Sequence, residues 1–438
     1  MNISRSIAAL FLLIPISSGA QQIVTPEEAV SIALQKNYDV RISENILAGA
    51  QVGVNNSFGL FLPDVNLTSS RMWNKNDQRQ ILADNSERGA TGIPSKNLNA
   101  SVQMSWTLFD GLKMFATRKR LEEIELQGED LVKSQMNITV ANVISAYYSV
   151  VREMQQLKAI NEQISVGEER IKLAERQLDV GTGIKTVLLQ AKVDLNAFKV
   201  AALAQEALIK QRKSELSQLL SISLPEEFEV NDTILLNLDL TREEILEGME
   251  DTNPALVAAR RNVNIARYAL KERKGERLPL VNFVGNYNFS RTINTVVINN
   301  FTTLFNQNKG LNYGFTASIP ILNNLVARNA VQLASVTIRQ QELAYEQLRA
   351  QAVIGVRIAY IAYDNARKVL VIEEENVLFA RENVSILLES FKRGVATFIE
   401  LRTAQQTMVD AYSRLTTARY NAKVSETELL RLKGALLK

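Results

Sequence analysis

Apolar residues recur at every seventh position through two long segments of the chain. The first repeat runs from Met136 to Leu178, and the second runs from Val356 to Phe391. A sustained period of seven is typical of helices that pack as left-handed coiled coils. The helical patterns around these repeats cover about 110–179 and 323–392, and each such helix would be roughly 100 Å long at 1.5 Å per residue.

A short glycine-containing turn follows each long helix. The turns are Gly181, Thr182 and Gly183 in the first half and Gly394, Val395 and Ala396 in the second. Further helical patterns follow them over 184–220 and 397–435. Because glycine adopts the left-handed conformation that ends helices, we predict an antiparallel helical hairpin in each half. Taken alone, such hairpins also fit a soluble coiled-coil rod.

Four shorter segments alternate between apolar and polar residues, which is the pattern of β-strands whose two faces have different surroundings. They cover 64–71, 98–108, 281–290 and 311–321. The alternation is weakest in 64–71. In the others, one face carries large apolar residues and the other is rich in uncharged Asn, Ser, Thr and Gln. Alternation alone also fits a soluble sheet that packs one face on a core.

Length and composition favour a membrane barrel over a soluble sheet. A strand of about ten residues suffices to cross the hydrocarbon when it is tilted. Small uncharged polar side chains suit a water-filled interior. The aromatic residues expected at the membrane interface are Trp106, Tyr287, Phe289 and Tyr313. Two polar segments without helical period, 72–97 and 293–310, are expected to form the exposed outer loops.

Four strands cannot close a barrel, and open sheet edges are not tolerated in lipid. The smallest common bacterial barrels have about eight strands. Two copies of the chain would supply eight strands, and three copies would supply twelve. The physical argument therefore predicts an oligomer and leaves its size open.

The two halves of the chain resemble each other. Residues 25–66 align without gaps to residues 241–282, and after a difference of three residues Gly181 aligns with Gly394. Each half has the order helix, strand, polar loop, strand, very long helix, glycine turn, helix, with the first helical pattern over 27–60 or 241–277. We therefore predict a first repeat over 21–220, a non-helical connector over 221–240 and a second repeat over 241–438.

Residues 1–20 have the pattern of a secretory signal peptide. Arg5 supplies a positive charge, Ile7 to Ile16 is a short apolar core, and Ser18-Gly19-Ala20 fits the small-residue cleavage rule. A buried helix or membrane anchor is the alternative, but a run of about ten apolar residues is too short to span a bilayer. We expect an exported chain that begins at Gln21 and has no transmembrane helix.

Composition excludes several kinds of chemistry. The sequence contains no His and no Cys, which removes disulfides, thiol nucleophiles, Cys/His metal sites and His-based catalysis. The net charge is only +3, so bulk electrostatics gives no reason to propose nucleic acid as a partner. Residues 181–186 lack the Gly-Lys-[Ser/Thr] junction of a phosphate loop. We expect no enzymatic activity, no cofactor and no metal.

The order of these elements, together with several short motifs, resembles the TolC-type outer-membrane efflux family. The motifs are Leu62-Pro63 and Leu278-Pro279 before strands, Trp-Thr-Leu-Phe-Asp-Gly-Leu at 106–112, Ile-Pro-Ile-Leu-Asn-Asn-Leu at 319–325, Val-Gly-Thr at 180–182, and Arg-Gly-Val-Ala-Thr-Phe-Ile-Glu-Leu at 393–401. The resemblance covers essentially all of the mature chain. It implies an α+β membrane protein in which three protomers, with four strands each, complete a twelve-stranded β-barrel continued by a long antiparallel coiled-coil helical tunnel.

The resemblance also implies location and function. The barrel would lie in the cell outer membrane and the tunnel in the periplasm. The homotrimer would be the passive channel of a tripartite efflux or type I secretion system. It would export small molecules or polypeptides from an inner-membrane pump of the RND or ABC type through a periplasmic adaptor protein. The alternative from a different class is an exported soluble coiled-coil scaffold that binds partner proteins through its hairpins.

Carried over to this sequence, the resemblance assigns roles to two places. The turns at 181–183 and 394–396 match the tips that contact the adaptor. Glu400, six residues past Gly394, matches the first acidic position of a ring that narrows the tunnel, and three such carboxylates would attract cations. The second acidic position is Thr403 here. The alternative for Glu400 is a solvated helix charge.

Overall fold

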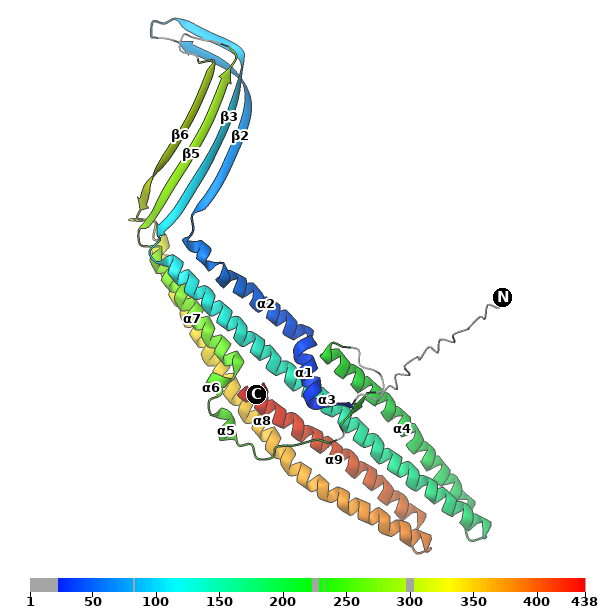
Figure 1. The fold of residues 1–438 in the computed structure, drawn as a ribbon. Helices are drawn as coiled ribbons and strands as arrows, with labels where there is room; N and C mark the ends of the chain where they lie inside the picture. The colour runs from blue at the N-terminus through cyan, green and yellow to red at the C-terminus, as the bar shows by residue number, and fades with distance from the viewer. Residues whose placement is uncertain (1–22, 82, 223–227, 232, 297–302, 438) are drawn as a thin grey trace, which may run out of the picture. The chain divides into compact units, whose positions relative to one another are not determined.

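The computed structural model describes residues 23–81, 83–222, 228–231, 233–296 and 303–437 (Figure 1). The expected signal peptide at 1–20 lies outside the described residues. The chain forms two compact units, each built from both halves of the sequence. The helical unit takes in residues up to Ile42, Lys133–Asn253 and Gln351–Lys438, and the sheet unit takes in Ser43–Val132 and Pro254–Ala350.

Helices make up most of the described chain. They are α1 (Pro26–Lys36), α2 (Tyr38–Asn55), the 3-10 helix η1 (Ser57–Phe61), α3 (Lys113–Asp179), α4 (Lys185–Leu220), α5 (Arg242–Leu246), α6 (Met249–Thr252), α7 (Pro254–Gly275), α8 (Val326–Lys392) and α9 (Phe398–Lys433). The helices α3 and α8 have 67 residues each, and α4 and α9 have 36 each. In Figure 1, α4 folds back along α3 and α9 folds back along α8, as the glycine turns predict. No described helix has an apolar stretch long enough to cross a membrane.

The expectation of continuous helices over 27–60 and 241–277 is wrong. The first is broken at Asn37, whose Oδ1 accepts hydrogen bonds from the main-chain N–H groups of Asp39, at 2.9 Å, and Val40, at 3.3 Å. This side chain caps the start of α2, because an amide oxygen satisfies N–H groups that lack a partner in the first helical turn. The second is broken at Gly248, which has φ of +70°, and again before Pro254.

The heptad pattern identifies the packed side of α8. All six of its seven-spaced residues, from Val356 to Phe391, are buried. On α3 only Val143 and Val150 of the predicted positions are fully buried. Farther along α3, Gln163 and Arg170 are almost completely buried, and each lies one residue before an apolar position that the pattern indicates.

A four-stranded sheet dominates the other unit. Its strands are β2 (Asp64–Ile81), β3 (Glu87–Phe109), β5 (Leu280–Asn294) and β6 (Phe305–Ser318), in the order β2-β3-β5-β6 with every neighbouring pair antiparallel. Figure 1 shows them side by side in one curved layer. A second sheet, in the helical unit, pairs β1 (Ile23–Val24) with β4 (Glu229–Val230) in parallel. The strand β4 lies in the predicted non-helical connector.

The outer loop expected over 72–97 is wrong, because most of it is strand. The strands β2 and β3 stay paired out to Ile81 and Glu87, with one register shift between Asn76 and Gln78. Main-chain hydrogen bonds hold such a ribbon whatever its side chains are, so it needs no apolar alternation. In the second half, strand extends to Asn294 and resumes at Phe305, so the expected loop over 293–310 is shorter. The expected strand 311–321 ends at Ser318, just before Pro320, which lacks the N–H that a ladder requires.

Candidate functional site

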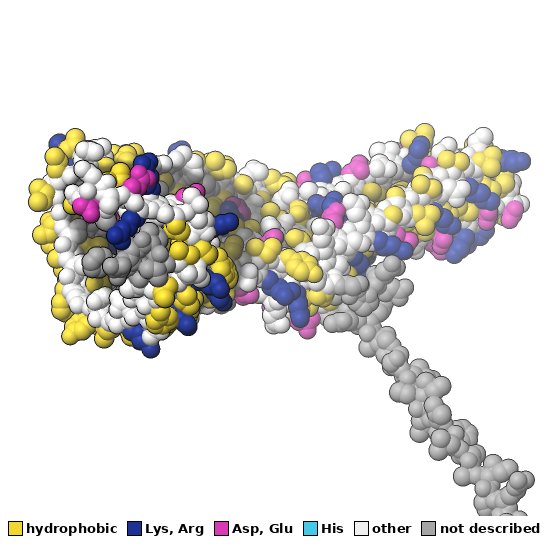
Figure 2. Space-filling model, turned by 90° about the horizontal axis from the view of Figure 1, so that it is seen from above, with side chains coloured by type: hydrophobic (Ala, Val, Ile, Leu, Met, Phe, Trp, Pro, Cys, Tyr) yellow, Lys and Arg dark blue, Asp and Glu magenta, His cyan; other side chains and the backbone are white. Residues whose placement is uncertain are grey.

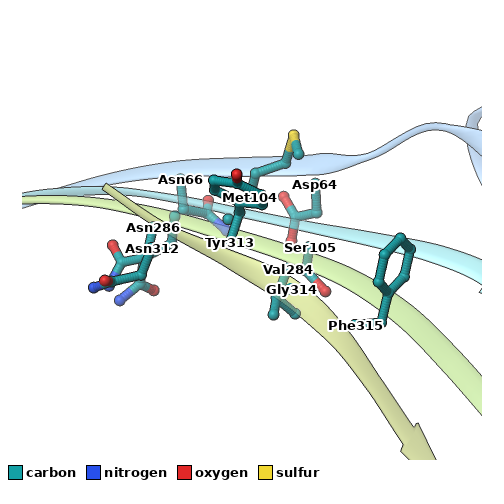
Figure 3. A pocket seen from close by; sticks show the side chains of 12 residues that line it. Asp64, Asn66, Met104, Ser105, Val284, Asn286, Asn312, Tyr313, Gly314 and Phe315 are labelled. Atoms are coloured by element: carbon teal, nitrogen blue, oxygen red, sulfur yellow. The ribbon is translucent and has the colours of Figure 1, made fainter. Parts of the chain in front are cut away.

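The sheet presents two chemically different faces, as the alternation predicts. Directly paired residues on neighbouring strands point to the same face. One row across the sheet consists of Val65, Met104, Gly285 and Tyr313, and the next consists of Asn66, Gln103, Asn286 and Asn312. Figure 3 shows the side chains of Asn286 and Asn312 together on one side of the sheet and those of Met104 and Tyr313 on the other.

The polar side of the sheet is hollowed. A pocket there is lined by the polar side chains of Asp64, Asn66, Gln103, Ser105, Asn286 and Asn312, and by the apolar side chains of Met104, Val284, Tyr313 and Phe315 (Figure 3). A second hollow continues along the strands past Thr68, Ser101 and Asn288. These amides and hydroxyls both donate and accept hydrogen bonds, so this surface suits contact with water and with polar solutes.

The apolar side carries all four aromatic residues expected at a membrane interface. By register, Trp106, Tyr287, Phe289 and Tyr313 share the face of Met104. Tyr313 is 74% exposed in the single chain, and the Trp106 indole N–H donates a 2.8 Å hydrogen bond to the Phe61 carbonyl. Seen from above, hydrophobic side chains gather around the outside of the curved sheet (Figure 2).

The first hairpin turn is tightly closed. Gly181 has φ of +78°, a conformation that costs other residues about 1–2 kcal/mol. The Gln177 carbonyl accepts main-chain hydrogen bonds from Thr182, at 3.0 Å, and Gly183, at 2.7 Å. A Cβ at Gly183 would lie 2.7 Å from the Leu178 nitrogen, so this second glycine is needed for close approach.

The second turn repeats the geometry of the first, although two of its three residues differ. Gly394 has φ of +74°, and the Ser390 carbonyl accepts hydrogen bonds from Val395, at 2.9 Å, and Ala396, at 3.3 Å. Ala396 occupies the place of Gly183, and its longer hydrogen bond leaves room for the methyl group. Val395 is 79% exposed, so an apolar side chain projects from this tip.

Glu400 caps the helix that follows the second turn. Its carboxylate accepts hydrogen bonds from the Thr397 main-chain N–H, at 2.7 Å, and from the Thr397 hydroxyl, at 2.8 Å. The Thr397 hydroxyl in turn accepts from the Glu400 N–H, which completes a capping box. These hydrogen bonds to Thr397 lower the pKa of Glu400, so the group is ionised at neutral pH. The hydroxyl of Thr403 donates to the Ile399 carbonyl.

A buried ionic cluster joins the two hairpins, and the sequence reasoning missed it. Arg170 on α3 is 2% exposed and donates to Asp194 on α4, at 2.7 Å, and to Gln405 on α9, at 2.6 Å. Arg402 also approaches Asp194, at 3.4 Å. Burial lowers the pKa of Arg170, and Asp194 opposes that effect. Gln163 and Arg170 are seven residues apart, and this heptad spacing was the sequence signal that could have placed both side chains on the packed side of α3.

The sheet has two free edges. Among the described residues, β2 pairs only with β3, and β6 pairs only with β5. The outer edges of β2 and β6 therefore each present a row of main-chain groups without partners from this chain. Such edges are a site for pairing with another chain.

Comparison with known proteins identifies relatives that match most of the chain. The chain is 23% identical over 406 residues to the outer membrane protein TolC of Vibrio cholerae, a match that covers 87% of this chain and 84% of that protein. It is 22% identical over 359 residues to the outer membrane efflux protein BepC of Brucella suis, covering 80% and 76%. Among solved structures, the CmeC outer membrane channel of Campylobacter jejuni has the same fold, with a TM-score of 0.76 at 15% identity over 94% of this chain and 85% of that one.

A family model gives the assignment. The model described as "Outer membrane efflux protein" matches residues 29–221 and 246–435. These two segments include both hairpins and all four strands of the large sheet. The chain belongs to the outer membrane efflux protein family.

Proposed function

We propose that this outer-membrane protein is one protomer of a trimeric export channel. Three copies would join their four-stranded sheets into a twelve-stranded barrel, and the helical hairpins would form a tunnel in the periplasm. Substrate, whether small molecules or polypeptides, would pass from an inner-membrane pump of the RND or ABC type through an adaptor protein into this tunnel. The protein would act as a passive conduit and perform no chemical step.

The free edges of the sheet carry this proposal. The strand β2 runs from the helical connections outward, and β6 runs back toward them, because neighbours in the order β2-β3-β5-β6 are antiparallel. When β6 of one copy meets β2 of the next, the new pair is also antiparallel. The pattern therefore closes without a break, and closure removes edges that lipid does not tolerate. The polar hollow would then face the lumen and the aromatic side would face lipid.

The hairpin turns are proposed as the docking tips for the adaptor. Support comes from their exposure and from their main-chain geometry, which is nearly the same in both halves. The tips present apolar side chains to solvent, with Val180 74% and Val395 79% exposed. Exposed apolar groups on a fixed turn suit contact with another protein.

Glu400 is proposed to belong to a ring of three carboxylates in the trimer. Because hydrogen bonds from Thr397 lower its pKa, each carboxylate keeps its charge at neutral pH. The same side chain caps α9, so replacing it has two consequences. Gln at this position keeps most of the capping box and removes the charge, since Gln also serves in such boxes, whereas Ala removes both.

Single-channel conductance in a planar bilayer, with the mass of the detergent-solubilised protein measured alongside, tests the proposal. We expect discrete, cation-preferring steps from a trimeric species. In the Glu400→Gln channel the cation preference falls while the steps remain. A water-soluble species that gives no steps would contradict the channel and favour a coiled-coil scaffold. Unchanged selectivity in Glu400→Gln would remove the ring while leaving the channel.

A further inference from the structure

Basic residues lie on the apolar face of the sheet, toward the ends of the strands that are farthest from the helices. Arg71 and Arg291 occupy one row, on either side of Leu98. Lys309 lies one row nearer the helical connections, and Lys96 lies one row farther out. All four side chains are exposed. We call Arg71, Lys96, Arg291 and Lys309 the basic belt.

Charge in this region is confined to that one face. On the opposite face, the rows that alternate with the belt contain uncharged residues: Thr68, Ser101, Asn288 and Gly310; Ser70, Asn99, Ser290 and Asn308; and Met72, Asn97, Thr292 and Asn306. The three rows of the belt itself contain no carboxylate. A belt that served solutes in the lumen would lie on the polar face, so its partner lies outside the barrel.

Aromatic rings on the same face support three of the four cations. The cation-to-ring distances are 4.9 Å for Arg71 on Trp73, 5.2 Å for Arg291 on Phe305 and 5.8 Å for Lys309 on Phe289. Within the described residues, no carboxylate forms a salt bridge with any member of the belt. The cations are thus positioned by rings and remain available to an anion. Aromatic rings beside basic groups are typical of the boundary between hydrocarbon and headgroups.

Depth along the strands places the belt at that boundary. From Val281, at the start of the apolar face on β5, to Arg291 is a run of ten residues, or about 33 Å at 3.3 Å per residue. A tilt of about 40° reduces this to about 25 Å, the height of the apolar band of outer-membrane barrels. The belt would therefore lie where the hydrocarbon ends on the outer side.

We propose that the basic belt binds the phosphate groups of phosphorylated glycolipid in the outer leaflet. The proposal rests on the proposed function, because only a lipid-facing barrel brings this face to the headgroups. Guanidinium groups match phosphate oxygens in a two-pronged geometry. Each Lys or Arg near an anionic membrane surface strengthens attachment. Three protomers would place three belts around the barrel and fix its depth in the membrane.

The direct test compares two lipids on the wild-type protein. Native mass spectrometry of the delipidated protein in neutral detergent would measure binding of bisphosphorylated lipid A, of the same lipid without phosphates, and of inorganic phosphate. We expect the bisphosphorylated lipid to bind at least about tenfold more tightly than the dephosphorylated one. Equal affinity for the two lipids overturns the proposal. Inorganic phosphate binding as tightly as bisphosphorylated lipid A also overturns it, since the site would then select free phosphate.

Charge variants assign the effect to the belt. The triple variant Arg71→Gln, Lys96→Gln, Arg291→Gln should lose the preference for phosphorylated lipid. The control variant Arg79→Gln, Arg88→Gln should keep the preference for phosphorylated lipid. Both arginines lie farther from the helices than the belt, on the outer part of β2 and β3, and Arg79 already donates a hydrogen bond to Glu87 at 2.9 Å. A triple variant that keeps the full preference would show that other residues carry it.

Conductance of the same preparations separates this proposal from the channel itself. A wild-type protein that conducts as a trimer but binds both lipids equally rules out the belt and leaves the channel intact. A wild-type protein that neither conducts nor forms a trimer rules out the proposed function, and the belt with it. A triple variant that conducts normally without lipid preference is the result that the belt predicts.

Discussion

At the scale of single residues, the free-energy cost of burying an unpaired charge determines how much stability is lost when Arg170 is replaced. Its guanidinium is 2% exposed and holds Asp194 and Gln405. Removing one partner of a buried ion pair leaves the other uncompensated, which typically costs about 3–5 kcal/mol. Gln190 and Arg402 also contact Asp194. Asp194 therefore keeps two partners when Arg170 is replaced, and we expect a loss of stability near the lower end of that range.

We therefore expect Arg170→Met to lower the free energy of unfolding of the helical unit by about 3 kcal/mol. Urea-induced loss of the helical circular dichroism signal would measure it. The matched control is Lys172→Met, which removes a salt bridge to Glu169 between side chains that are 63% and 55% exposed. Surface pairs contribute about 0–1 kcal/mol. Similar losses in both variants would mean that Arg170 is not an essential link between the hairpins.

A second prediction at this scale concerns close approach at the first turn. The Cβ in Gly183→Ala would meet the Leu178 nitrogen at 2.7 Å and the Gln177 carbonyl carbon at 2.8 Å. The main chain cannot move aside as a flexible side chain does, so the turn must open. We expect this to destabilise the turn by about 1–3 kcal/mol. We expect trypsin to cleave the native protein after Lys185 at least about fivefold faster, since local opening governs such cleavage.

The second turn supplies the control for that prediction. Ala396 already stands at the equivalent position, with its N–H 3.3 Å from the Ser390 carbonyl. Ala396→Gly relieves no close contact. It lowers the free energy of unfolding by less than about 1 kcal/mol, because glycine gives the unfolded chain more conformational freedom. Cleavage after Arg393 should therefore change little. An unchanged rate at Lys185 in Gly183→Ala would show that the turn absorbs a methyl group without opening.

At the scale of elements, two tyrosines attach the connector to the long helices. The Tyr147 hydroxyl on α3 donates to the Val24 carbonyl, at 2.8 Å, and accepts from the Asn231 N–H, at 2.9 Å. It thereby holds both strands of the small parallel sheet. Burial raises the pKa of Tyr147 to about 12, so the hydroxyl keeps its proton and donates at neutral pH. Tyr363 on α8 donates to the Asn237 carbonyl, at 2.8 Å.

Tyr147→Phe should loosen this small sheet without unfolding α3. The ring stays packed, while a buried carbonyl and N–H lose their partner, at about 1–3 kcal/mol. Hydrogen exchange at residues 23–24 and 229–231 should accelerate about 5- to 150-fold. Tyr360→Phe is the control, because no hydrogen bond of its hydroxyl is present in the described chain. Equal exchange in both variants would contradict the role of Tyr147.

Elements whose residues repeat were predictable, and those held by single polar contacts were not. The heptads from Val356 to Phe391 identify the buried side of α8, because coiled-coil packing imposes its period on the sequence. The break at Asn37 depends on one side chain that accepts two main-chain hydrogen bonds, which no period reveals. The outer part of β2 and β3 is held by main-chain pairing, which imposes no apolar period on the sequence. The Arg170 cluster was not predicted either, because it places polar side chains in a core where a heptad pattern leads one to expect apolar residues.

At the scale of the whole molecule, the remaining question is how the sheet closes. The sequence has no cysteine, so an introduced pair gives an unambiguous cross-link. Disulfides need Cα atoms about 4.4–6.8 Å apart, a distance that directly paired neighbouring strands provide. Barrel closure staggers the strands, so the partner of a given residue on β2 does not follow from the register within one chain.

We therefore expect Thr68→Cys on β2, combined in turn with Asn308→Cys, Asn312→Cys or Thr316→Cys on β6, to give one pairing that cross-links neighbouring protomers. All four positions lie on the polar face. Complete oxidation should yield a covalent trimer on a denaturing gel, because three edges close in a ring. Ser101→Cys with the same β6 series is the control, since β3 has neighbours on both sides within its own chain. A covalent dimer as the final product would instead indicate an eight-stranded closure by two copies, and the absence of any cross-link would mean that Thr68 is directly paired with none of these three β6 residues of a neighbouring copy.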